Sequence, residues 1–175
     1  VAQQLTAMGL TPAPALRELV ATQGDAARWY GGRPSAPTVF IPGNGSTPIP
    51  TPAGMISLAA AKDARGELHS NKTASLIDIG DGIACLEFRG KMNVLDDGAV
   101  TMLAEALPTL ARIGGFRGLV IGNQGENFCA GADLRTVLAA AEASDFAALE
   151  RAVAALQTAL MDLRHGDLPV VVAPH

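Results

Sequence analysis

The chain has 175 residues, with 13 basic and 17 acidic side chains that give a formal net charge of −4. Its 49% hydrophobic and 17% charged residues are typical of a soluble protein that buries a core, and no apolar run is long enough to span a membrane. The mild acidity without a Lys or Arg cluster argues against nucleic acid as a partner, and two cysteines form neither a disulfide framework nor a zinc site.

The first segment predicts two short helices within residues 1–31. Leu16, Leu19 and Val20 repeat at helical spacing in the second helix, and Pro14 suits its first turn. We interpret this segment as a small helical element that needs a partner surface.

The next segment is rich in proline. Six of the chain's 11 prolines fall between Gly31 and Gly54. Because proline lacks an amide donor and fixes φ, we expect residues 34–54 to lack regular secondary structure over most of their length. Thr38–Ile41 can form one short strand. We interpret residues 34–72 as a linker, or as an extended strap on a neighbouring surface.

The second half begins with a predicted β-hairpin. Ala74–Ile79 and Ile83–Phe88 have strand composition, and Gly80–Gly82 forms a tight turn between them. Apolar residues at helical spacing predict a helix from about Asp96. The uninterrupted apolar run Gly118–Gly122 suits a strand that is buried on both faces.

Two more helices and a final strand follow. The spacing of Leu134, Val137 and Leu138 predicts the first helix, and an apolar stripe from Phe146 to Leu163 predicts the second. We interpret that stripe as core packing, with Ser144 as the N-cap and Asp145 in the first turn. Leu168–Ala173 predicts a strand. The order β-β-α-β-α-α-β indicates an α/β domain.

The most informative stretch links the predicted buried strand to a helix, from Gly122 to Leu134. Amide groups at a helix start lack intrahelical partners, and the small residues Ala130, Gly131 and Ala132 would let a ligand approach the backbone. These features predict a site for an oxyanion or a polarised carbonyl group. The alternative is a glycine-rich turn that serves packing alone. The stretch contains neither a dinucleotide-binding nor a P-loop fingerprint.

Several motifs together resemble one enzyme family. Asn127–Leu134 resembles the oxyanion-hole signature of the crotonase (enoyl-CoA hydratase/isomerase) superfamily. Arg89–Leu95 follows the hairpin where that family has its first CoA-contacting loop. Leu168–Ala173 resembles the strand that leads to the family's second glycine-rich loop. The resemblance covers about residues 73–175 and implies a partial crotonase-like ββα spiral, preceded by a short helical segment and the proline-rich strap.

The resemblance assigns roles to individual residues. The Ala132 amide would be one oxyanion donor to the thioester carbonyl of acyl-CoA. Ala130 and Gly131 would line the adenine and pantetheine path. Lys91 and Met92 would lie along the CoA, although Lys91 is equally consistent with a solvated loop lysine. Asp133 is expected to cap its helix. The resemblance implies no metal.

A second resemblance concerns the first 72 residues. Segments such as Ala27–Tyr30 and Gly54–Leu58 resemble the end of a bacterial 3-hydroxyacyl-CoA dehydrogenase that carries a crotonase-like domain. Residues 1–33 would be the dehydrogenase tail, residues 34–72 the strap, and residues 73–175 the truncated N-terminal part of the crotonase-like domain.

These resemblances imply a fragment of a cytoplasmic fatty-acid β-oxidation protein that acts on acyl-CoA, with NAD bound in an upstream domain. The second oxyanion donor and the acid/base glutamates would follow His175, so we expect the 175-residue chain itself to be inactive. The alternatives are a non-catalytic CoA-binding or assembly module and a purely structural domain. Association into a homo-oligomer is expected from the resemblance alone.

Overall fold

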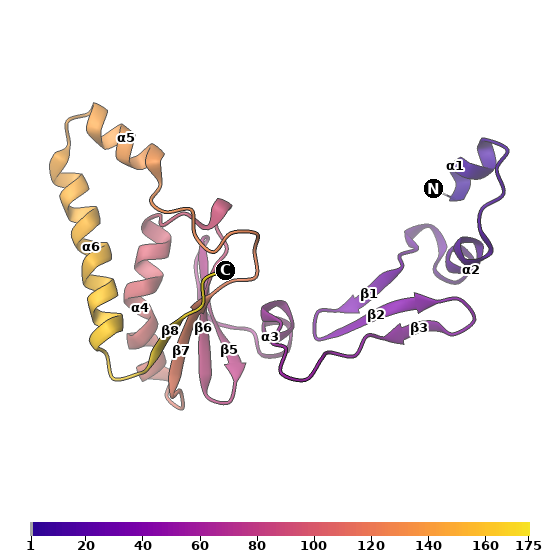
Figure 1. Cartoon of the computed structure of the whole chain (residues 1–175), viewed down its shortest axis with the longest axis horizontal. Helices are drawn as coiled ribbons and strands as arrows, with labels where there is room; N and C mark the ends of the chain where they lie inside the picture. Colours follow the sequence, from indigo (N-terminus) through magenta and orange to yellow (C-terminus); the bar gives the residue numbers. More distant parts are fainter. Residues whose placement is uncertain (1) are drawn as a thin grey trace. The chain divides into compact units, whose positions relative to one another are not determined.

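The computed structural model describes residues 2–175 and divides into two compact units, Val1–Asp63 and Ala64–His175 (Figure 1). Among the described residues, no helix combines the length and the apolar character needed to cross a membrane.

The first unit begins with the two predicted helices. They are α1 (Ala2–Ala7) and α2 (Pro14–Gln23), and a short 3₁₀ turn, η1 (Gly24–Ala26), follows. Proline at the start of α2 costs little because the first amides of a helix have no intrahelical acceptor. Leu19 is the buried residue of α2. The prediction of two short helices is therefore confirmed.

The proline-rich segment forms a small sheet whose strands take up about half of residues 34–54, so the expectation that this range lacks regular structure over most of its length is met only in part. Three antiparallel strands pair in the order β1-β2-β3, with the predicted short strand at the centre. Their bounds are β1 (Tyr30–Arg33), β2 (Ala36–Ile41) and β3 (Gly45–Pro48). The buried ring of Phe40 in β2 packs edge-on against Trp29, with ring centroids 6.0 Å apart.

The positions of the prolines explain why the sheet forms. Pro34 and Pro42 lie in the two turns, and Pro48 is the last residue of β3. Pro37 lies within β2, but its carbonyl accepts from the Ile49 amide at 2.8 Å, so its backbone faces the end of β3. The donor that Pro37 lacks is thus missing only where pairing with β3 ends. A proline disrupts strand pairing where the sheet needs a backbone N–H that proline does not have.

A single carboxylate fastens the turn between β1 and β2. Asp63, on α3 (Leu58–Arg65), accepts from Nε and Nη2 of Arg33 at 3.1 and 2.8 Å. Its second oxygen accepts from the Ser35 amide at 3.2 Å and from the Ser35 hydroxyl. The Ser35 hydroxyl and the Arg33 guanidinium lower the pKa of Asp63 below its ordinary value.

The second unit is built on a five-stranded sheet in the order β4-β5-β6-β7-β8. The β4–β5 and β5–β6 pairs are antiparallel, whereas the β6–β7 and β7–β8 pairs are parallel. The strands are β4 (Glu67–Ser70), β5 (Ala74–Gly80), β6 (Ile83–Phe88), β7 (Gly118–Gly122) and β8 (Val170–Val172). The predicted hairpin, the buried strand and the last strand are confirmed. The edge strand β4 is an addition that the sequence did not indicate.

Three helices accompany this sheet, namely α4 (Asp97–Ile113), α5 (Leu134–Glu142) and α6 (Phe146–His165). Helices α4 and α6 lie against the same face (Figure 1). The core between them contains Leu76 and Leu86 from the hairpin, Met102 from α4, Leu119 from β7 and Leu163 from α6. The predicted α/β order is therefore confirmed.

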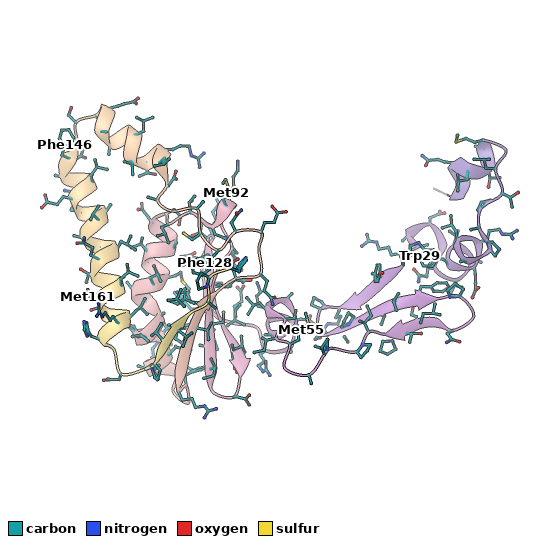
Figure 2. All side chains as sticks on the ribbon, in the orientation of Figure 1. Trp29, Met55, Met92, Phe128, Phe146 and Met161 are labelled. Atoms are coloured by element: carbon teal, nitrogen blue, oxygen red, sulfur yellow. The ribbon has the colours of Figure 1, made fainter. Side chains whose placement is uncertain are left out.

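The apolar stripe of α6 is only partly core, which corrects one prediction. Leu163 is buried, but Phe146 is 66% exposed and Val153 56% exposed. Figure 2 shows Phe146 at the end of α6 that follows α5. The last turns of α6 bring Ala159 and Leu163 into the core, and the first turns leave their apolar face uncovered.

The N-cap of α6 is also one residue later than predicted. Asp145 accepts from the Ala148 amide at 2.9 Å, so Asp145 is the cap. Ser144 instead adopts a left-handed conformation, with φ of 56°, at the turn after α5. This turn reverses the chain between the two helices, and the cap then falls on the first residue after it.

The Asp63 contacts predict an acid-dependent stability of the first unit. A carboxylate with a lowered pKa contributes its full stabilisation above the unfolded-state pKa of about 3.9. That contribution is lost as the pH falls through the still lower folded-state pKa. We expect Asp63→Asn to lower the denaturation midpoint at pH 7, and the difference from the wild type to shrink below about pH 4. A difference that stayed constant from neutral to acidic pH, in chemical denaturation followed by Trp29 fluorescence, would contradict this role.

The position of the α6 cap gives a second prediction. Replacing Asp145 with alanine should lower the free energy of unfolding by about 0.5–2 kcal/mol, because the Ala148 amide loses its acceptor. Ser144→Ala is the matched control. Serine and alanine have a similar cost in the left-handed conformation at position 144, and the Ser144 side chain does not cap α6. Thermal unfolding of the two variants decides between the two caps. A loss of stability in Ser144→Ala as large as that in Asp145→Ala would contradict the assignment of the cap to Asp145 alone.

Candidate functional site

The candidate site lies where two neighbouring parallel strands end. Strands β6 and β7 run in the same direction, with Glu87 opposite Gly122 at the end of the pairing. Their exit loops, residues 89–95 and 123–133, therefore emerge at the same edge of the sheet. This edge brings together the two segments that the sequence singled out.

Backbone hydrogen bonds join the two loops directly. The Ala130 amide donates to the Met92 carbonyl at 3.2 Å, and the Leu95 amide donates to the Gly131 carbonyl at 2.8 Å. Leu95 and Ala132 form an isolated parallel bridge. Lys91, next to Met92, lies on the same loop. The structure thus gathers all five predicted site residues, Lys91, Met92, Ala130, Gly131 and Ala132.

The same bonds orient the Ala132 amide. The Gly131 carbonyl and the Ala132 N–H belong to one peptide unit, and no peptide bond in the described chain is cis. In a planar trans peptide these two groups point in opposite directions. Because the carbonyl points to Leu95, the Ala132 N–H points away from that segment. It has no hydrogen-bond partner among residues 2–175, and Ala132 is exposed.

Unusual backbone conformations shape both loops. Met92 and Asn93 are left-handed, with φ of 54° and 51°, in the short 3₁₀ turn η2 (Lys91–Asn93). Gly131 has φ of 88°, a conformation that favours glycine. Met92 is 58% exposed (Figure 2), and Lys91 is exposed without an ion pair to any described residue.

The first turn of α5 is already occupied by a carboxylate. Asp133 is the N-cap and accepts from the Arg135 amide at 3.1 Å, as predicted for this residue. Its negative charge interacts favourably with the positive end of the helix dipole, and its hydrogen bond satisfies one amide of the first turn. The cap satisfies the Arg135 amide, and the Ala132 amide, which precedes the cap, has no acceptor among the described residues.

Two asparagines hold the loop by side-chain hydrogen bonds, and no sequence motif pointed to this role. Asn93 is 7% exposed, and its Nδ2 donates to the Asn127 carbonyl at 2.7 Å. Asn123, directly after β7, donates from Nδ2 to the Phe128 carbonyl at 2.8 Å. Its Oδ1 accepts from the Gly125 amide at 2.9 Å. The signal was present, since asparagine tolerates left-handed φ and bonds to nearby backbone.

An aromatic pair fixes the loop to the core. Phe128 is partly buried against the core cluster, and its ring lies edge-on to Phe88 with centroids 6.3 Å apart. Figure 2 shows Phe128 directed inward and Met92 outward from this end of the unit. The loop is therefore held by an apolar anchor as well as by hydrogen bonds.

A cavity of about 570 Å³ lies beside Ala132, between α4, α5 and α6. Its lining is mainly apolar and includes Leu95, Val100, Ala132, Val137, Val153 and Leu156. A cavity of this size with a mainly apolar lining can hold a hydrocarbon group. Within residues 2–175, no group of three or more His, Cys, Asp or Glu side chains is arranged to hold a metal ion.

Known proteins resemble this chain in sequence and in fold. No family model matches the chain. Over 119 residues the chain is 38% identical to "Probable 3-hydroxyacyl-CoA dehydrogenase" of Bacillus subtilis (strain 168), a match that covers 68% of this chain. The chain spans only 15% of the length of that relative.

Solved structures share the fold. A protein of Streptomyces coelicolor A3(2) assigned as an enoyl-CoA hydratase is 27% identical, with a TM-score of 0.51, over 59% of this chain and 38% of its own. An enoyl-CoA hydratase from Polaromonas sp. JS666 is 21% identical, with a TM-score of 0.54, over 58% of this chain and 40% of its own. The matches to these two structures cover more residues than the first unit contains, so they extend into the second unit. The resemblance to the crotonase (enoyl-CoA hydratase/isomerase) superfamily and to a bacterial 3-hydroxyacyl-CoA dehydrogenase is thereby confirmed.

Proposed function

We propose that this chain is part of a fatty-acid β-oxidation enzyme and that its second unit binds acyl-CoA thioesters for hydration of an enoyl group. The observation that carries the proposal is the Ala132 amide, which has no acceptor among residues 2–175 and points away from the bond that fixes its peptide. An amide held in this way is a donor prepared in advance for a negatively charged oxygen.

The chemistry uses this donor at the thioester carbonyl. When water adds to an enoyl thioester, negative charge accumulates on the carbonyl oxygen in an enolate-like transition state. A hydrogen bond from the Ala132 amide stabilises that charge more than it stabilises the neutral carbonyl, so it lowers the barrier. The neighbouring amides of Ala130 and Gly131 already donate, to the Met92 carbonyl and the Cys129 Sγ, so among these three amides only that of Ala132 is available for this role.

The CoA part would follow the exposed side of the two loops. Lys91 and Met92 would lie along the CoA, where the Lys91 ammonium can offset phosphate charge. Ala130 and Gly131 would line the adenine and pantetheine path, since their small size lets a ligand approach the backbone. Both loops are exposed at this edge, which supports the proposal.

The cavity of about 570 Å³ beside Ala132 would receive the acyl group. Its apolar lining from α4, α5 and α6 favours an aliphatic chain over a polar one. An acyl chain in this cavity would place the adjoining thioester close to Ala132, which is one of the lining residues.

The remaining machinery would belong to the longer protein. The second oxyanion donor and the acid/base glutamates would follow His175, and an upstream domain would oxidise the 3-hydroxyacyl product with NAD. The match to the Bacillus subtilis protein, which covers 68% of this chain but only 15% of that protein, supports this arrangement. We propose a cytoplasmic location and association into a homo-oligomer for the whole protein.

The proposal predicts the effect of removing one hydrogen. In the full-length protein, Ala132→Pro deletes the donor and should lower the rate of crotonyl-CoA hydration by about 10²–10³-fold, as loss of one oxyanion donor does elsewhere. The NAD-linked oxidation of 3-hydroxyacyl-CoA, which depends on the upstream domain, should persist in the same preparation. Circular dichroism checks that the fold is unchanged.

A second variant separates electrostatics from steric blocking. Ala132→Trp keeps the amide but obstructs the cavity, so it should weaken acyl-CoA binding, whereas the proline variant should chiefly lower kcat. Full hydration by a correctly folded Ala132→Pro protein would remove the oxyanion role. Tight acyl-CoA binding by a wild-type protein without hydration would favour the alternative of a non-catalytic CoA-binding module.

A further inference from the structure

We propose that Asn93 is a positioning residue that sets the direction of the Ala132 amide through the hydrogen bond from its side chain to the Asn127 carbonyl. The inference rests on the proposed function of Ala132 and adds a residue to it. Asn93 does not touch the ligand path, since its side chain is buried beneath the loop.

The backbone of Asn93 determines where Leu95 lies. The Asn93 amide donates to the Gly90 carbonyl at 3.1 Å and closes the turn, and its left-handed φ of 51° redirects the chain. Two residues later the Leu95 amide reaches the Gly131 carbonyl at 2.8 Å. That bond fixes the peptide plane to which the Ala132 N–H belongs.

The side chain of Asn93 contacts the loop of residues 123–133 at a second point, several residues before Gly131. Its Nδ2 holds the Asn127 carbonyl at 2.7 Å, and Asn123 holds the next carbonyl, that of Phe128, at 2.8 Å. A Cβ atom on Gly125 would lie 3.4 Å from Asn93 Nδ2 and 3.2 Å from Asn123 Oδ1, so the two amide side chains converge under Gly125. The loop is thus held at two consecutive carbonyls a few residues before Ala132.

Asn93 therefore connects both loops by two independent means. Its backbone conformation delivers the Leu95 donor to one end of the loop, and its side chain fixes an earlier carbonyl. Movement of either attachment would rotate or shift the Gly131–Ala132 peptide. A misplacement of about 1 Å can cost on the order of 10²-fold in rate even when the binding groups remain.

The test uses full-length protein and separates the two roles of Asn93. Asn93→Gly keeps a residue that tolerates left-handed φ but removes the side-chain donor. We expect kcat for crotonyl-CoA hydration to fall on the order of 10²-fold, with KM nearly unchanged, because a misdirected donor is felt mainly in the transition state. Glu126→Ala, an exposed position on the same loop, is the matched control and should retain the wild-type kcat.

A spectroscopic readout reports the hydrogen bond itself. Hexanoyl-CoA labelled with carbon-13 at the thioester carbonyl cannot be hydrated, and its carbonyl stretch falls when a donor polarises it. The shift on binding should be smaller in Asn93→Gly than in the wild type or Glu126→Ala. A merely structural role would change the melting temperature and leave this shift in the folded protein intact.

Asn93→Asp provides a second variant if the glycine protein does not fold. The carboxylate has the same shape but cannot donate to the Asn127 carbonyl, so it should lose kcat and carbonyl shift in the same way. Wild-type kcat and wild-type carbonyl shift in either folded variant, alongside an inactive Ala132→Pro, would overturn the inference and leave the proposed function standing. An active Ala132→Pro protein would overturn the proposed function, and the inference with it.

Discussion

The parallel pairing of β6 with β7 is the constraint on which the candidate site depends. Parallel neighbours place their carboxyl ends at one edge, so the loops after Phe88 and Gly122 must leave the sheet side by side. Without this pairing, the segments around Met92 and Ala132 would have no reason to meet. The core that buries Leu86 and Leu119 against α4 holds the two strands in register.

Loops of this kind must satisfy their backbone groups without regular pairing. Here the deficit is met by side-chain amides and by a few cross-loop bonds, so the loop from Asn123 to Asp133 is held along most of its length. The Ala132 amide has no acceptor among the described residues, and it belongs to a peptide whose carbonyl is held by the Leu95 amide. A rigid surrounding and one unpaired donor are what electrostatic stabilisation of a carbonyl requires, because no energy is then needed to orient the donor during reaction.

The differences between expectation and structure share one cause. Proline and apolar periodicity describe what a residue tolerates or prefers, and they do not say which of its groups faces a neighbour. Pro37 fits inside β2 because the amide it lacks would face the end of β3. The apolar stripe of α6 has an ideal spacing, yet only its last turns reach the sheet, so Phe146 stays exposed.

Apart from the edge strand β4, sequence alone determined the order of strands and helices in the second unit, the helix cap at Asp133 and the segment that carries the site, because hydrophobic period and capping are local properties. It also identified Lys91, Met92, Ala130, Gly131 and Ala132 as one candidate group, through a resemblance of short motifs. Only the tertiary structure decided that the Ala132 amide points away from Leu95 and that Asn93 supports its loop. Those facts depend on contacts between residues about 30 or more positions apart, such as Leu95 with Gly131 and Asn93 with Asn127, which no local pattern specifies.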